Sequence, residues 1–149
     1  MSLVLKPFHE LLEMHFIIPP YQRGYRWESR KVEELLDDLL DFVKSLKTKR
    51  NRNNEGHEPY YCLQPITVVR HPENADTYFV VDGQQRLTTI YILMHYLSKN
   101  SDYEYPVYTF SLPSRDVQNG YLDKLEFMED DKKFIDNIDN FYVKKAYST

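Results

Sequence analysis

A group of polar residues lies between two apolar stretches near the middle of the chain. In TYFVVDGQQRLTTIYILMHYL, residues 77–97, a strand-like apolar run ends at Asp82-Gly83, and a helix-like apolar run follows Arg86. The first backbone N–H groups of a helix have no partners within it, so together with the helix dipole they favour an anion. Gly83 would let the backbone turn tightly beside a ligand, and Arg86 offers a planar fork for phosphate oxygens. The alternative is an ordinary strand-to-helix turn with its polar side chains in solvent.

Other side chains at this junction fit either interpretation. Thr88 and Thr89 would place hydroxyl groups in the first helical turn, and Gln84 and Gln85 offer amides. Asp82 could bind a cation that accompanies phosphates, or it could cap the helix. The junction is not a Walker A loop, because it lacks the second Gly and the Lys of that motif.

A second unusual stretch is PPYQRGYRW, residues 19–27. Arg23 and Arg26 lie three positions apart, and aromatic residues alternate with them. Arginine beside aromatic rings suits stacking on a base combined with contact to phosphate. The alternative is that Tyr21 and Trp27 fill the core while the arginines pair with carboxylates. Both interpretations remain open on the residues alone.

Composition limits the class of protein. The 149 residues are enough for one domain with a real core, and 42% hydrophobic residues suit a globular protein. A net charge of −4 argues against broad nucleic-acid binding by this chain alone, since phosphate neutralisation needs a surplus of Lys and Arg. The single Cys62 excludes an internal disulfide. With no signal peptide and no apolar stretch of membrane-spanning length, we expect a soluble cytoplasmic protein.

The apolar patterning predicts an α+β fold. A small mixed sheet with packed helices is expected before residue 113, and a helical C-terminal part after it. Pro65 implies that the strand containing it is broken or lies at an edge. The expected helices are 7–14, 29–46 and 87–98, and the expected strands are 15–18, 60–70, 77–83 and 105–110.

The chain divides into two parts on this pattern. Residues 1–112 form the predicted site-bearing domain, and residues 113–149 are the predicted start of a helical region. The helical spacing of Ile138, Phe141 and Tyr142 continues to the end without a cap or a breaker. We therefore expect the chain to be truncated, as a piece of a larger protein.

Two motifs in this order carry a family resemblance. IPPYQRGYRW, an LLDDL-bearing helix, an apolar strand and then VVDGQQRLTT together resemble the DGQQR-motif family. That family is typified by the N-terminal, GmrS-like half of GmrSD type IV restriction systems, and the resemblance spans residues 7–98. The chain departs from the family pattern at Gln64-Pro65, where relatives commonly have Leu-Gly.

The resemblance implies a ParB/sulfiredoxin-like domain that binds and hydrolyses nucleoside triphosphates with Mg²⁺. The expected catalytic residues are in the second motif, with Asp82 also a candidate metal ligand, and Arg86 is expected to face Arg23. The resemblance thus assigns Asp82, Gln84, Gln85 and Arg86 to catalysis, and Tyr21, Gln22, Arg23, Arg26, Gly83, Thr88 and Thr89 to nucleotide binding.

The predicted function is an NTP-binding and NTP-hydrolysing module of a phage-defence restriction protein that acts on foreign, modified DNA. Larger relatives add an HNH-type nuclease, but the five histidines here are dispersed, so DNA cleavage by this segment is not expected. DNA contact would then come through the full-length protein or a nuclease partner, and oligomers are possible. The alternatives are a nonenzymatic, nucleotide-responsive DNA-sensing module and a scaffold that pairs with a nuclease subunit.

Overall fold

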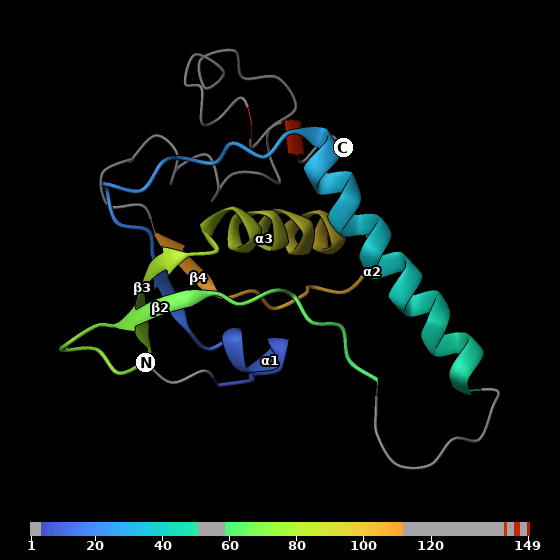
Figure 1. Cartoon of the computed structure of the whole chain (residues 1–149), viewed down its shortest axis with the longest axis horizontal. Helices are drawn as coiled ribbons and strands as arrows, with labels where there is room; N and C mark the ends of the chain where they lie inside the picture. Colours follow the sequence, from blue (N-terminus) through green and yellow to red (C-terminus); the bar gives the residue numbers. More distant parts are fainter. Residues whose placement is uncertain (1–3, 51–58, 112–141, 143–144, 147–148) are drawn as a thin grey trace.

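The computed structural model describes residues 4–50, 59–111, 142, 145–146 and 149 (Figure 1). Its helices include α1 (Phe8–Leu11), α2 (Ser29–Arg50) and α3 (Gln84–Lys99). The four strands are β1 (His15–Ile17), β2 (Thr67–Arg70), β3 (Thr77–Asp82) and β4 (Thr109–Ser111). The fold is therefore α+β, as the sequence predicts.

A small mixed sheet positions the rest of the molecule. Its strand order is β2-β3-β1-β4, with β1 parallel to both β3 and β4, and β2 antiparallel to β3. The register aligns Phe16 with Tyr78 on one side and with Phe110 on the other. Because β1 and β3 are parallel neighbours, the segments that follow them leave the sheet at the same edge. This edge is where both sequence motifs begin.

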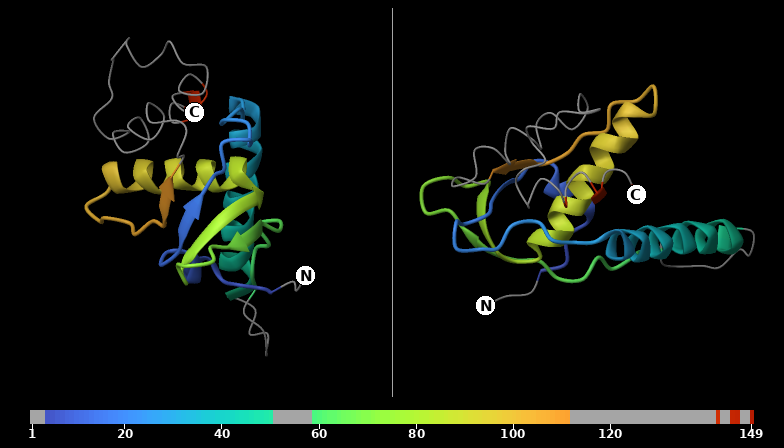
Figure 2. Two further views of the ribbon diagram at one scale, coloured as in Figure 1. Left: turned by 90° about the vertical axis from the view of Figure 1, so that its left-hand side faces the viewer. Right: turned by 90° about the horizontal axis from the view of Figure 1, so that it is seen from above.

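The core lies between one face of the sheet and the first half of α3. Figures 1 and 2 show α3 lying across the sheet. Phe16, Val80 and Tyr108 on the sheet side, with Leu87 and Ile90 on the helix, belong to one buried cluster. Their burial is the main source of stability, since apolar area removed from water contributes about 25 cal/mol per Å².

The structure corrects several boundaries. Helix α3 begins at Gln84 and not at residue 87, so the QQR residues form its first turn. The strand expected at 60–70 is restricted to β2, which starts two residues after Pro65 and lies at the sheet edge. Proline has no N–H to donate to a ladder, which explains the late start. The strand expected at 105–110 shortens to β4.

Strand β3 is less buried than its apolar sequence suggests. Only Val80 is fully buried, and Val81 is exposed on the opposite face of the sheet. Alternate residues of a strand point to opposite faces, so a strand covered on one side only has this pattern. The second half of α3 is likewise exposed at Tyr96 and Leu97.

Most of the C-terminal region predicted as helical lies outside the described residues. Tyr142 and the pair 145–146 are helical. Ala146 is buried in the same core cluster as Phe16, and Tyr142 packs against that cluster. These residues therefore pack against the part that contains both motifs.

Candidate functional site

The two motifs meet at the carboxyl edge of the parallel strands. We call residues 19–27 the arginine segment and residues 82–86 the DGQQR segment. The arginine segment follows β1 and the DGQQR segment ends β3 and starts α3. In open sheets with parallel strands, ligands bind outside this edge. The sheet topology thus brings together two segments that are about sixty residues apart in the sequence.

Glutamine side chains join the two segments directly. Gln84 Nε2 donates to the backbone carbonyl of Arg23 at 2.9 Å. Gln85 Nε2 donates to the carbonyl of Gly24 at 2.9 Å, and its Oε1 accepts from the backbone N–H of Arg26 at 2.7 Å. Each amide therefore holds the main chain of the arginine segment. Neither glutamine amide lies in a solvent-facing loop. The alternative of a turn with its polar side chains in solvent therefore does not hold for these two residues.

Two further contacts complete this connection. Gln22 Nε2 donates to the carbonyl of Val81 at 2.8 Å. The buried Tyr25 hydroxyl shares a hydrogen bond of 2.8 Å with Thr89 Oγ1. Burial raises the pKa of Tyr25 to about 12, so this phenol stays neutral and keeps its hydrogen bond at ordinary pH. Tyr25 is not among the predicted site residues, although it lies between two arginines in the sequence.

Gly83 has a conformation that only glycine adopts easily. Its φ is +91°, and it is the N-cap of α3 with no side-chain cap. A Cβ at this position would lie 3.1 Å from Ile66 Cγ1 and 3.3 Å from Ile66 Cα. The turn therefore depends on glycine for backbone freedom and for space.

We expect Gly83→Ala to lower the free energy of unfolding by about 1–3 kcal/mol, because it adds left-handed strain and crowds Ile66. Urea denaturation followed by circular dichroism measures the change. Gly83→Asn is the control: asparagine tolerates left-handed backbone better, so it should cost less than alanine if strain dominates. A Gly83→Ala protein within about 0.5 kcal/mol of wild type, the usual range for a neutral surface change, would contradict this account.

Arg86 does not face Arg23, so this prediction is wrong. Its guanidinium donates to Gln64 Oε1 at 2.5 Å and makes a long contact of 3.5 Å to the Pro65 carbonyl. Gln84 and Arg86 are two positions apart on a helix, so their side chains point about 200° apart around its axis. Since Gln84 faces the arginine segment, Arg86 points to the other side. Gln64 is thus the partner of Arg86.

The threonines are not presented at the helix start. Thr88 Oγ1 and Thr89 Oγ1 donate to the carbonyls of Gln84 and Gln85, one turn back, at 2.9 Å each. Both side chains are buried. They lie in the second turn, because α3 starts three residues earlier than its apolar pattern indicates. Both hydroxyl groups are therefore occupied by helix carbonyls, and that of Thr89 also contacts Tyr25.

Four groups at this edge remain available to a ligand. The backbone N–H groups of Gln84, Gln85 and Arg86 have no acceptor among the described residues, whereas that of Leu87 donates to the Gly83 carbonyl. The exposed side chains of Arg23 and Asp82 make no hydrogen bond or ion pair within that part of the chain. Tyr21 is 77% exposed. The edge thus combines a cation, a carboxylate, an open ring and free amide donors.

The remaining residues of the arginine segment have structural contacts. Arg26 donates from Nη1 to the Tyr25 carbonyl at 2.8 Å, and its guanidinium carbon lies 5.6 Å from the centre of the Tyr142 ring. Trp27 is half-buried against the core. Tyr25 and Trp27 are therefore the aromatic residues that pack inside, and Tyr21 does not. Within the described ranges, no three His, Cys, Asp or Glu side chains gather to hold a metal.

A comparison with known protein families identifies the family of this chain. Residues 8–148 match the model of the GmrSD restriction endonuclease, N-terminal domain. The chain belongs to this family. The match covers nearly the whole chain and crosses the division predicted at residue 112. No curated protein matches the sequence.

Membership of the GmrSD N-terminal family supports a role in restriction-type phage defence. It also points to DNA and a nuclease as partners. Over the part of the GmrSD domain that the structure describes, no helix has the length and apolar character needed to cross a bilayer.

Proposed function

We propose that this GmrSD N-terminal domain binds a nucleoside triphosphate with Mg²⁺ at the edge where the arginine and DGQQR segments meet, and that it hydrolyses the nucleotide. The observation that carries the proposal is the junction itself. Three hydrogen bonds join the two segments directly, and two more reach Val81 and Thr89 beside the DGQQR segment. Among the described residues, these bonds leave the side chains of Arg23 and Asp82 and the first N–H groups of α3 without a partner. Helix N-terminal amides with an adjacent guanidinium form a suitable phosphate site.

Each available group has a distinct proposed role. The α3 amides and Arg23 bind phosphate oxygens, where positioned charge supplies most of the catalysis of phosphoryl transfer. Asp82 supplies one carboxylate to Mg²⁺, which in nucleotide sites takes one or two carboxylates and completes its shell with phosphates and water. Tyr21 stacks on the base. Arg86 reaches the phosphates when it leaves Gln64, an exposed contact of low cost.

Isothermal titration with NTP and Mg²⁺ tests this proposal. We expect Arg23→Ala to weaken binding at least about tenfold, since a charge-assisted hydrogen bond contributes about 1.5–3 kcal/mol. Arg86→Ala should weaken it less. Arg70→Ala is the matched control, because Arg70 pairs with Tyr78 toward the opposite end of β3 from Asp82. Equal affinities for wild type and Arg23→Ala would refute the assignment.

One observation favours a second candidate function. Both amide atoms of Gln85 are bonded to the arginine segment, so this side chain is not placed to orient an attacking water. The domain would then use the nucleotide as an effector that switches DNA or nuclease contacts. A phosphate-release assay under saturating NTP separates the two: turnover supports the hydrolase, and binding without turnover supports the effector. In both cases the role in defence is that of a nucleotide module in a larger restriction assembly.

A further inference from the structure

The second half of α2 exposes an apolar stripe. Leu40 is 55% exposed and Val43 is 45% exposed, and Leu36 next to them is half-buried. Figure 2 shows this end of the helix extending away from the sheet and α3. Side chains spaced by four and three positions lie on one side of a helix. The three residues therefore form a continuous apolar face, in which Leu36 packs partly against the core cluster and Leu40 and Val43 are exposed.

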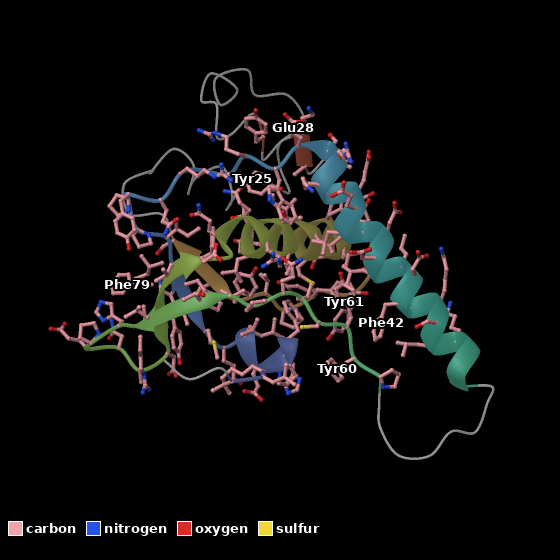
Figure 3. All side chains as sticks on the ribbon, in the orientation of Figure 1. Tyr25, Glu28, Phe42, Tyr60, Tyr61 and Phe79 are labelled. Carbon is pink, nitrogen blue, oxygen red and sulfur yellow. The ribbon has the colours of Figure 1, made fainter. Side chains whose placement is uncertain are left out.

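A different face of α2 holds the helix to the body. Phe42 on α2 packs against Tyr61 of the segment before β2, with ring centroids 5.8 Å apart (Figure 3). The Tyr61 hydroxyl donates to Asp38 Oδ2 at 3.2 Å. Leu35 on the same side is buried. Since this side is already occupied and Leu36 packs partly against the core, the exposed part of the stripe is the surface around Leu40 and Val43.

The stripe has the spacing of a coiled-coil seam. Alternating steps of three and four residues connect its members, and the same spacing continues to an acidic residue before it and a basic residue after it. Heptad spacing keeps one face toward a partner helix along the whole contact. The seam positions are Glu33, Leu36, Leu40, Val43 and Lys47.

We propose that this surface binds a second copy of the same chain, with the two α2 helices antiparallel about a two-fold axis. In that arrangement Leu40 of one copy packs against Val43 of the other. The flanking residue Asp37 then lies opposite Lys44 of the partner copy, and the two-fold axis repeats the pair. Isologous contacts of this kind need a self-complementary surface. The acidic first half and basic last turns of α2 provide it.

The charges of α2 favour an antiparallel partner helix over a parallel one. Acidic residues precede the centre of the stripe at Leu40, and basic residues follow it: Glu33, Glu34, Asp37 and Asp38 on one side, Lys44 and Lys47 on the other. A parallel pair would place like charges side by side, whereas the antiparallel pair places opposite charges together. In the single chain Lys44 pairs with Asp41 at 2.9 Å, with both side chains largely exposed. Such a surface pair contributes little.

Analytical ultracentrifugation over a concentration series tests the proposal on the intact chain. We expect wild type to form a dimer that dissociates on the order of 10 µM, because a seam of this length buries a small interface. Asp37→Lys and Lys44→Asp should each weaken self-association by about tenfold, since each replaces two attractive pairs with two repulsive ones. Leu40→Lys should abolish it.

The decisive experiment mixes the two charge variants. A chain with Asp37→Lys carries only lysine at the flanking positions, and a chain with Lys44→Asp carries only aspartate. Their mixture should form a heterodimer about as tight as wild type, although each variant alone is a monomer at the same concentration. Unchanged circular dichroism of each variant establishes that it is folded. A wild type that stays monomeric throughout, a dimer unaffected by these changes, or a mixture that does not associate would each overturn the proposal.

Discussion

Replacing Gln85 with alanine is expected to lower the free energy of unfolding by about 2–4 kcal/mol. The substitution leaves the Gly24 carbonyl and the Arg26 N–H without their partners at a part-buried junction. Each unsatisfied backbone group costs about 1–3 kcal/mol. The same change should abolish measurable nucleotide binding, because the arginine segment is no longer held against the start of α3. Urea denaturation and isothermal titration with NTP and Mg²⁺ measure the two effects.

Two control variants make the Gln85 prediction specific. Gln85→Glu can still accept from the Arg26 N–H but cannot donate to Gly24 when ionised, so its stability should lie between alanine and wild type. Gln64→Ala removes an exposed glutamine from the contact with Arg86 and should cost less than about 1 kcal/mol. If Gln85→Ala were as stable as wild type, the proposed role of this amide in joining the segments would be wrong.

A similarly large loss of stability is expected from Tyr108→Ala, about 3–5 kcal/mol. Tyr108 has no exposed surface, its ring meets those of Phe8, Phe16 and Tyr91, and its hydroxyl donates to the Leu87 carbonyl. Burial raises the pKa of Tyr108 well above its ordinary value, so the phenol stays neutral. Truncation leaves a cavity at the point where α1, the sheet and α3 meet. Thermal or urea denaturation measures the loss.

The phenylalanine variant separates packing from hydrogen bonding at this position. Tyr108→Phe keeps the ring contacts and removes one hydrogen bond, so we expect a cost of about 0.5–1.5 kcal/mol. Tyr103→Ala is the surface control and should change stability by less than about 0.5 kcal/mol, because that side chain is mostly exposed. Equal losses for the alanine and phenylalanine variants would show that the ring contacts do not stabilise the core as proposed.

Local pattern was sufficient for the elements with strong periodicity. The apolar spacing from Ser29 predicted α2, and the run after Arg86 predicted α3 apart from its first turn. That turn was missed because Gln84, Gln85 and Arg86 carry no apolar signal, although all three residue types are acceptable in helices. Strand ends were missed for a related reason: the ladder that ends β4 at three residues depends on its neighbour β1, which is itself short.

The sequence by itself determined which residue types are present at the site, and the two motifs and the family that they indicate. Only the tertiary structure decided which of those side chains are available. Parallel pairing of β1 and β3 puts both segments at one edge, and the phase of α3 turns Gln84 toward the arginine segment and Arg86 away from it. Pairing partners and helix phase are set by contacts between distant residues, so no local pattern contains them. The glutamines of DGQQR therefore hold the two segments together, and the side chains of Arg23 and Asp82 and the first N–H groups of α3 have no partner among the described residues.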